Sequence, residues 1–223
     1  MLRAVIFDVD FTLAKPGPDL GAEGYCRLGE RYGLDLDPAR YDEARVAAFA
    51  EVKLHPELDH DEEIWVLFTE RVIVGMGGVG DTYNAAVEME RAWVHSHHFE
   101  LFPDALPTIQ AFRDRGLLIG MLSNSSRDLE EFVAHHGLYA DAVLTSNDHG
   151  KTKPHSSIFH ALLAKLDVEP HEAVMVGDML EDDIEGAQAV GMHAVLVDRE
   201  NRYPDVADRL PDLSGLLEEL GLD

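Results

Sequence analysis

The sequence has few positive charges, a single cysteine and no long hydrophobic segment. Only 18 residues are lysine or arginine, whereas 43 are aspartate or glutamate, so the net charge of the 223 residues is -25 at pH 7. Nucleic acids and anionic membranes repel a protein of this charge, and we therefore expect neither as a partner. With Cys26 alone, an internal disulfide is excluded, which fits a reducing compartment.

The apolar runs are also too short for a signal peptide or a membrane-spanning helix. The first run ends at Asp8, and none approaches the roughly 18 apolar residues that a spanning helix needs. Hydrophobic residues still make up 46% of the chain, which is enough to form a core. We therefore expect a soluble cytoplasmic protein, and the sequence leaves open whether it is a monomer or a homodimer.

Five short apolar runs have the character of strands that are buried on both faces. None of them alternates with polar residues, which is typical of strands in a parallel sheet. Helix-like stretches separate the last four runs, so we predict an α/β fold, a doubly wound Rossmann-like parallel sheet of about five strands. The runs are 4–7, 117–122, 142–144, 173–176 and 194–197, and the predicted helices are 108–115, 128–136, 157–166, 183–190 and 213–220. Ser125 and Asp128 have the spacing of a capping box at the start of the second helix.

The segment between the first two runs has a different pattern. From about residue 14 to about residue 98 we find no convincing strand, and apolar residues recur at helical spacing, as in Ile64, Leu67 and Phe68. Connections in α/β folds are usually a few residues long, so about 85 residues here imply an inserted helical subdomain. We predict a core of residues 1–14 and 99–223 and a helical cap of residues 15–98. Four basic residues of the cap are candidate substrate contacts, although a solvated helix face explains each equally well: Arg45, Lys53, Arg71 and Arg91.

Two carboxylates follow the first predicted strand. Asp8 and Asp10 are two residues apart, so they lie on one side if the chain stays extended. The carboxyl ends of strands line the ligand crevice of such sheets, and two acids there repel each other unless a cation compensates. Carboxylate oxygens suit Mg²⁺. On this motif alone, a solvated strand end in an acidic protein is an equally good interpretation.

Polar groups that suit a phosphate follow two other strands. Ser123 and Asn124 end the second predicted strand and offer neutral donors to a phosphate oxygen. Lys153, in a Lys-Thr-Lys-Pro segment, is a point charge for a phosphoryl group. Taken singly, these residues are better explained by turns, caps and a solvated loop.

A third acid follows the fourth predicted strand. Gly177 allows a sharp turn, and Asp178 comes directly after it at the strand end. Asp183 and Asp182 lie in the first turn of the next helix, where the helix dipole also favours negative charge. The combination is more informative than its parts, because the separate strand ends supply groups that suit one kind of chemistry. The acids suit a metal ion, and the hydroxyl and the lysine suit a phosphate.

These four motifs, in this order, resemble those of the haloacid dehalogenase-like hydrolase superfamily, in the branch with a helical cap after the first motif. The family's Asp-x-Asp-x-Thr matches Asp8, Asp10 and Thr12, and its Ser or Thr after the second strand matches Ser123. Its Lys-Pro matches Lys153 and Pro154, and its Gly-Asp with a later acid matches Gly177, Asp178 and Asp183. Phe11 departs from the pattern, because the family often has Gly or Asn there, and its ring puts the substrate size in doubt.

The resemblance implies a Mg²⁺-dependent phosphatase that hydrolyses a small-molecule phosphomonoester through an aspartyl-phosphate. Asp8 is then the nucleophile, and Asp10 protonates the leaving group and later deprotonates the attacking water. Dehalogenases of the family lack the second acid. The implied site residues are Asp8 and Asp10 for catalysis, Thr12, Ser123, Asn124 and Lys153 for the phosphate, and Asp8, Asp10 through its carbonyl, Asp178 and Asp183 for the metal.

Two other functions remain open at this point. A sugar phosphomutase would use the same scaffold and differ in cap residues that one sequence does not identify. A phospho-acceptor module or a catalytically silent phosphate-binding protein also uses acids at strand ends. The long insertion and the pairing of Asp8 with Asp10 argue against this last class.

Overall fold

The computed structural model describes residues 1–51 and 55–222, and Lys53 lies outside them. The strands are β1 (Ala4–Phe7), β2 (Ala14–Pro16), β3 (Phe99–Leu101), β4 (Leu118–Ser123), β5 (Ala142–Thr145), β6 (Ala173–Gly177), β7 (His193–Val197) and β8 (Arg209–Leu210). The α-helices are α1 (Ala22–Arg31), α2 (Tyr41–Glu51), α3 (Glu62–Gly75), α4 (Thr82–Ala92), α5 (Ala105–Asp114), α6 (Leu129–His136), α7 (Ser146–His149), α8 (Ser156–Leu166), α9 (Gly186–Ala189) and α10 (Leu216–Glu219). Short 3₁₀ segments are η1 (Pro38–Arg40), η2 (Ser96–His98), η3 (Pro170–Glu172) and η5 (Leu213–Gly215), and η4 (Leu180–Glu185) is a π-helical turn.

Six strands form a sheet in the order β5-β4-β1-β6-β7-β8, and their pairings are parallel. β1 is central, with Phe7 opposite Met121 of β4 on one side and Val176 of β6 on the other. All of β1 is fully buried, which explains why its sequence does not alternate. The predicted α/β fold with a parallel sheet is confirmed. The sixth strand, β8, has only two residues, too few to show a periodic pattern.

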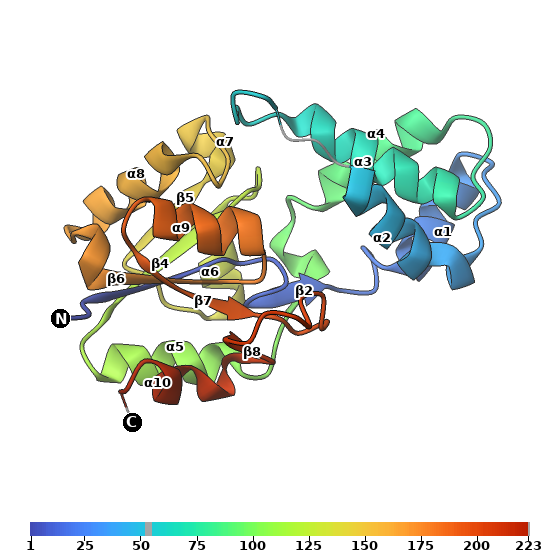
Figure 1. The fold of residues 1–223 in the computed structure, drawn as a ribbon. Helices are drawn as coiled ribbons and strands as arrows, with labels where there is room; N and C mark the ends of the chain where they lie inside the picture. The colour runs from blue at the N-terminus through green and yellow to red at the C-terminus, as the bar shows by residue number, and fades with distance from the viewer. Residues whose placement is uncertain (52–54, 223) are drawn as a thin grey trace. The chain divides into compact units, whose positions relative to one another are not determined.

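Helices cover both faces of this sheet (Figure 1). On one face, Ile6 and Met175 belong to a buried cluster with Phe159 and Leu162 of α8 and with Ala187 of α9. On the other face, the ring of Phe7 lies 6.1 Å from that of Phe112 in α5. Neighbouring residues of β1 thus enter opposite layers, as the period of a strand requires. The core therefore holds the carboxyl ends of β1, β4 and β6 in fixed register.

Some local predictions differ from the structure. Residues 14–16 form a short strand paired with β3, although no strand was expected after residue 14. The helix predicted over 183–190 begins earlier, as the π-helical turn η4, and continues as α9. The capping box predicted at Ser125 is wrong, because Asp128 caps α6 by accepting a hydrogen bond from the Glu131 amide at 3.0 Å, whereas the Ser125 hydroxyl bonds to Ser123.

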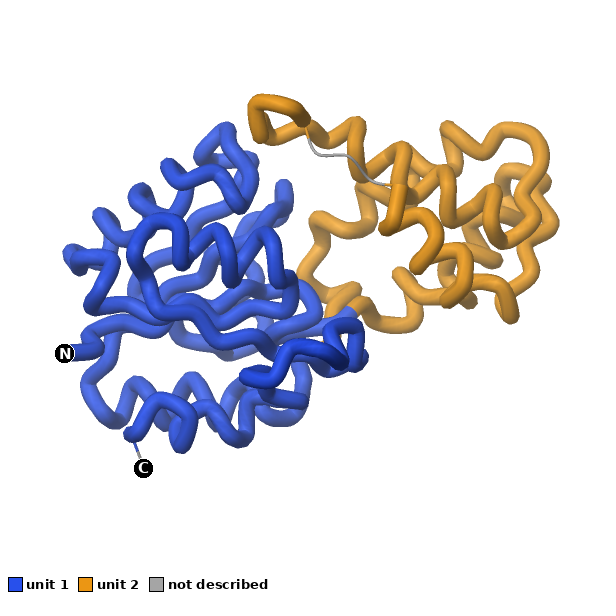
Figure 2. The backbone as a smooth tube through the Cα atoms, in the orientation of Figure 1, with its two compact units in different colours: residues 1–15, 101–223 blue, residues 16–100 orange. Residues whose placement is uncertain are grey.

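The chain divides into two compact units (Figure 2). One unit comprises Met1–Lys15 and Leu101–Asp223 and contains the six-stranded sheet, and the other is Pro16–Glu100. The second unit is mainly helical, with α1 to α4 inside it. Among the basic residues that the sequence offered as substrate contacts, Arg71 forms an exposed ion pair with Glu51. This is the arrangement expected if Arg71 lies on a helix face that is turned to solvent. Among the helices formed by the described residues, none is both long and apolar enough to span a membrane.

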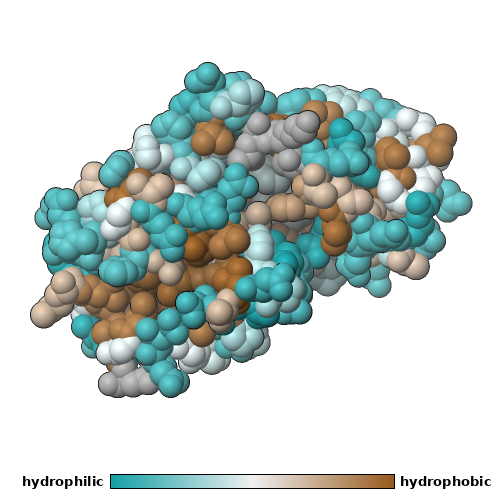
Figure 3. Space-filling model, in the orientation of Figure 1, coloured by the Kyte–Doolittle hydropathy of each residue, from teal (hydrophilic) through white to brown (hydrophobic). Residues whose placement is uncertain are grey.

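The face drawn in Figure 3 is mixed, with many hydrophilic residues and a continuous apolar area in its lower left part. Large exposed apolar side chains among the described residues are concentrated in the second unit, where Val46, Phe49, Leu67, Val74, Val79 and Tyr83 are each more than two-fifths exposed. In the first unit, the exposed large apolar side chains among the described residues are Met1 and Leu106.

Candidate active site

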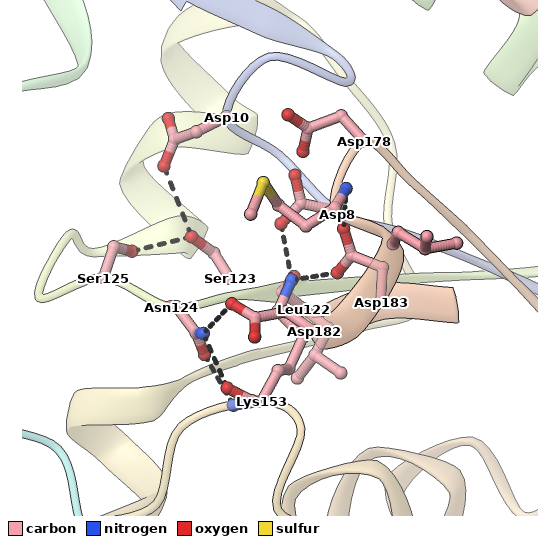
Figure 4. A network of polar contacts seen from close by, with 12 residues as sticks. Asp8, Asp10, Leu122, Ser123, Asn124, Ser125, Lys153, Asp178, Asp182 and Asp183 are labelled. Carbon is pink, nitrogen blue, oxygen red and sulfur yellow. Dashed lines mark hydrogen bonds and ion pairs between the residues drawn. The ribbon is translucent and has the colours of Figure 1, made fainter. Parts of the chain in front are cut away.

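The functional side chains meet at the carboxyl edge of the sheet (Figure 4). Asp8 directly follows β1, Ser123 ends β4 and Asp178 directly follows β6. The loop between α7 and α8 brings Lys153 to the same place, where its ammonium reaches Asp8. The structure therefore brings together residues from four separate stretches of the chain, as the parallel topology dictates.

The turn after β1 holds the first motif. The Asp8 amide donates to the Val176 carbonyl at 2.8 Å, so Asp8 continues the pairing of β1 with β6. Phe11 then takes a left-handed conformation with φ of 63°, which accounts for the family's frequent Gly or Asn at this position. Thr12 is fully buried, and its hydroxyl has no hydrogen-bond partner among the described residues. Its carbonyl accepts hydrogen bonds from Arg199, the nearer at 2.9 Å.

Lys153 is the central cation of the site. Its Nζ lies 2.6 Å from Asp8 Oδ1, 2.6 Å from Asp183 Oδ1 and 3.1 Å from the Leu122 carbonyl oxygen. The side chain is buried, and burial by itself lowers the pKa of a lysine. The carboxylates of Asp183 and Asp8 outweigh burial and raise the pKa of Lys153 above its usual value. Lys153 is therefore a permanent positive charge beside Asp8.

Three buried carboxylates form a cluster that fits a divalent cation. One oxygen from each of Asp8, Asp178 and Asp183 lies within 4.8 Å of the other two. Burial, together with the neighbouring acids, raises the pKa of Asp8 well above its usual value, although Lys153 opposes the rise. Burial and Asp183 likewise raise the pKa of Asp178 to about 7, against the opposing effect of Arg202. The cluster thus has more negative charge than its own cations offset, and a hard cation with oxygen ligands would correct that imbalance.

Arg202 contacts one of these acids. Its guanidinium forms an ion pair with Oδ2 of Asp178 and donates to the Asp178 carbonyl at 3.1 Å. The Arg202 side chain is 29% exposed, so it approaches Asp178 from the solvent side.

The side chain of Asp10 links the first motif to the second. Its Oδ2 is 3.5 Å from the Ser123 hydroxyl, which in turn bonds to the Ser125 hydroxyl at 2.9 Å (Figure 4). Its Oδ1 is 3.0 Å from Nη2 of Arg127. Asp10 is thus placed against Ser123, and it is not one of the three carboxylates that cluster around a possible metal position.

Asn124 joins the second and third motifs through the backbone. Its Nδ2 donates to the Lys153 carbonyl at 3.1 Å, and its Oδ1 accepts from the Lys153 amide at 2.8 Å. A further contact of 3.4 Å joins Nδ2 to Asp182, whose pKa burial and Asp183 raise to about 7. Both ends of the Asn124 amide therefore hold the backbone of Lys153.

Reasoning from motifs missed Arg127 and Arg202. Arg127 comes just before the helix cap Asp128, and Arg202 lies in the loop between β7 and β8. Composition gave no signal either, because most of the 18 basic residues of the chain are arginines. No spacing rule relates either residue to the acid that it contacts.

Comparison with known proteins identifies the family. A family model described as a haloacid dehalogenase-like hydrolase matches residues 2–191. The chain is 34% identical over 220 residues to ribulose-1,5-bisphosphate 5-phosphatase of Halopiger xanaduensis, covering 94% of this chain and 91% of that protein. It is 29% identical over 240 residues to phosphoserine phosphatase of Thermus thermophilus, covering 95% and 94%. A haloacid dehalogenase-like phosphatase structure from Thermococcus onnurineus matches with a TM-score of 0.67 and 29% identity, covering 100% of this chain and 99% of that one.

This chain belongs to the haloacid dehalogenase-like hydrolases, and the prediction made from its four motifs is confirmed. It is an enzyme of that family. The named relatives are phosphatases, which favours hydrolysis over the phospho-acceptor alternative.

Proposed function

We propose that this enzyme hydrolyses a small alkyl phosphomonoester, with Asp8 as the nucleophile and Mg²⁺ as the cofactor. The observation that carries the proposal is the arrangement of Asp8, Asp178 and Asp183 within 4.8 Å of one another, with Lys153 bonded to two of them. The relatives' names supply the substrate class, because ribulose bisphosphate and phosphoserine are both alkyl phosphates.

In the first step, an oxygen of the Asp8 carboxylate attacks phosphorus while Asp10 gives a proton to the leaving alkoxide oxygen. Lys153 and Ser123 hold the oxygens of the transferring group, and Lys153 offsets part of its charge. The product of this step is an aspartyl-phosphate on Asp8. In the second step, Asp10 takes a proton from water, whose oxygen attacks phosphorus. The bond between phosphorus and the Asp8 oxygen breaks, which restores the Asp8 carboxylate and releases inorganic phosphate.

Asp8, Asp178, Asp183 and the carbonyl of Asp10 are the proposed ligands of Mg²⁺. The ion would supply positive charge that reduces the repulsion between the Asp8 carboxylate and a phosphate dianion. We further propose that residues 1–14 and 99–223 are the catalytic core, and that residues 15–98 are the family's cap and choose among esters. Soluble cytoplasmic localisation, a small phosphate ester as the partner, no nucleic-acid or membrane partner, and a monomeric or homodimeric state remain part of the proposal.

The test is phosphate release from 4-nitrophenyl phosphate and from a panel of metabolite phosphates, with Mg²⁺ and with a chelator. We expect Mg²⁺-dependent release, reduced by more than about 10⁴-fold in Asp8→Asn, because the covalent step needs a carboxylate. Asp205→Asn makes the same chemical change at an exposed position of the same unit and should leave the rate unchanged. If pure wild-type protein with Mg²⁺ releases phosphate from no ester, the proposed function is wrong.

A further inference from the structure

Arg127 is a buried cation that lies behind Asp10. Its side chain is only 1% exposed, whereas the Asp10 side chain is 21% exposed, and the two form an ion pair with 3.0 Å between Arg127 Nη2 and Asp10 Oδ1. The arginine therefore contacts the carboxylate from the protein interior and leaves the solvent side of Asp10 open. A guanidinium so deeply buried needs a counter-charge, and Asp10 supplies one.

The two oxygens of Asp10 have different partners. Oδ1 pairs with Arg127, and Oδ2 lies 3.5 Å from the hydroxyl of Ser123 at the end of β4. Because a carboxylate is planar, fixing Oδ1 also fixes the direction of Oδ2. Oδ2 is the oxygen on the side of Ser123, where the phosphate is proposed to bind.

The guanidinium is itself held in place. Its carbon lies 5.1 Å from the centre of the Phe132 ring, within the range of a cation–π contact, and Phe132 is fully buried in α6. The backbone of Arg127 directly precedes Asp128, which caps α6 through the Glu131 amide. Both the side chain and the backbone of Arg127 are thus attached to a rigid helix.

We propose that Arg127 is a positioning residue that orients the carboxylate of Asp10, so that Oδ2 meets the leaving oxygen of the substrate. This inference rests on the proposed function, in which Asp10 transfers protons. Arg127 does not touch the substrate in this proposal and acts only through Asp10. Lysine would not replace it fully, because a flexible ammonium does not hold its nitrogen where the rigid guanidinium places Nη2.

The consequence is a dependence on the leaving group. An alkyl phosphate needs a proton at its leaving oxygen, whereas 4-nitrophenolate leaves without one. Misplacing Asp10 should therefore slow alkyl esters selectively. A purely structural role for Arg127 would instead lower both rates by the same factor.

The experiment compares kcat/KM for 4-nitrophenyl phosphate with that for the best alkyl phosphate of the panel, in wild-type protein and in Arg127→Gln. We expect a loss of about 10- to 100-fold for the alkyl ester and of less than about threefold for the aryl ester, since positioned proton transfer is worth about 10² to 10⁴ in rate. Arg127→Lys should recover part of the activity on the alkyl ester. If Arg127→Gln does not fold, Arg127→Lys is compared with the wild-type protein instead. Arg209→Gln removes a partly buried guanidinium of the same unit, one that pairs with Asp198, and should leave the ratio unchanged.

A double-mutant cycle separates orientation of Asp10 from other effects. In an Asp10→Asn background, Arg127→Gln should cause no further selective loss on the alkyl ester. Equal losses on both esters, or the same selective loss with and without the Asp10 carboxylate, overturn the inference and leave the proposed function standing. Absence of phosphate release from every ester in wild-type protein overturns both.

Discussion

The ammonium nitrogen of Lys153 lies 2.6 Å from Oδ1 of Asp8, and both side chains are almost completely buried. The lysine also bonds to Asp183, so one cation serves two of the three clustered acids. A buried ion pair contributes modestly when it is complete, but removing one partner leaves an uncompensated charge in a medium of low polarity. Lys153 is therefore required for the stability of the site as well as for its chemistry.

Lys153→Met should destabilise the metal-free protein by about 3–5 kcal/mol at a pH near 8, the usual cost of breaking a buried pair. The loss should be smaller in mild acid, because protonation of Asp8, whose pKa is already raised by burial, removes its charge. Urea unfolding at both pH values measures the difference. The control is Lys165→Met. Lys165 is exposed and donates to the Val143 carbonyl, so this variant should stay within about 0.5 kcal/mol of wild type. Equal stability of Lys153→Met and wild type near pH 8 would contradict the prediction.

The sequence predicted the sheet and the convergence of its motifs because both follow from local patterns. The run 4–7 is apolar on both faces, which indicates a buried parallel strand, and acids after such strands share one edge. Arg127 and Arg202 could not be placed in this way. Each reaches its acid through a loop whose path depends on packing, the ring of Phe132 in one case and the turn after β7 in the other. The two-residue strand β8 likewise exists through its pairing with Leu196 and Val197, not through its own sequence.

The stability of the metal-free protein should fall as pH rises, and Mg²⁺ should reverse the fall. Burial, with Asp183, raises the pKa of Asp178 to about 7 in the folded protein, whereas its ordinary value is 3.8. Between these two values the folded state holds a proton that the unfolded chain has lost. The contribution of Asp178 is therefore present at low pH, is lost as pH rises from about 4 to about 7, and is absent above.

Thermal unfolding with a chelator and with saturating Mg²⁺ tests this expectation. Because the ion competes with the proton for the carboxylate, the rise in Tm caused by Mg²⁺ should be larger near pH 8 than near pH 6. Asp178→Asn removes the titrating group, so both the pH dependence and the Mg²⁺ effect should become smaller. A rise in Tm with Mg²⁺ that is equal at both pH values, or larger near pH 6, would contradict the prediction.

Gly177 leaves room for Asp183. A Cβ atom built on Gly177 would lie 2.2 Å from Oδ2 and 2.5 Å from Cβ of Asp183, closer than real atoms approach. Gly177→Ala should therefore displace Asp183, weaken its bond to Lys153 and destabilise the protein by about 1–3 kcal/mol. Mg²⁺ affinity, measured by titration calorimetry, should fall with it. Gly21→Ala is the control, since its nearest neighbour would lie at 3.7 Å. Because Gly21 caps α1, this change should cost about 0.5–1 kcal/mol, but it should leave the Mg²⁺ affinity unchanged.

Phe11 occupies a backbone conformation that suits glycine. Its φ of 63° lies in the left-handed region, which costs an L-residue with a Cβ atom about 1–2 kcal/mol, and its amide is held by a 2.6 Å hydrogen bond to the Ala14 carbonyl. Phe11→Ala and Phe11→Gly both remove the ring, so their difference isolates the backbone. We expect the glycine variant to be the more stable of the two by about 1 kcal/mol in urea unfolding.

The opposite order should hold in an ordinary helix, and this provides the control. Ala164 is exposed in α8, where glycine is less favourable than alanine by about 1 kcal/mol, so Ala164→Gly should lower stability. If Phe11→Ala proves as stable as Phe11→Gly, the turn after Asp10 relaxes to a conformation with negative φ once the ring is gone. In that case the ring, rather than the hydrogen bond to Ala14, keeps Phe11 in its left-handed conformation. Phe11→Ala should then also move Asp10 and slow alkyl esters selectively.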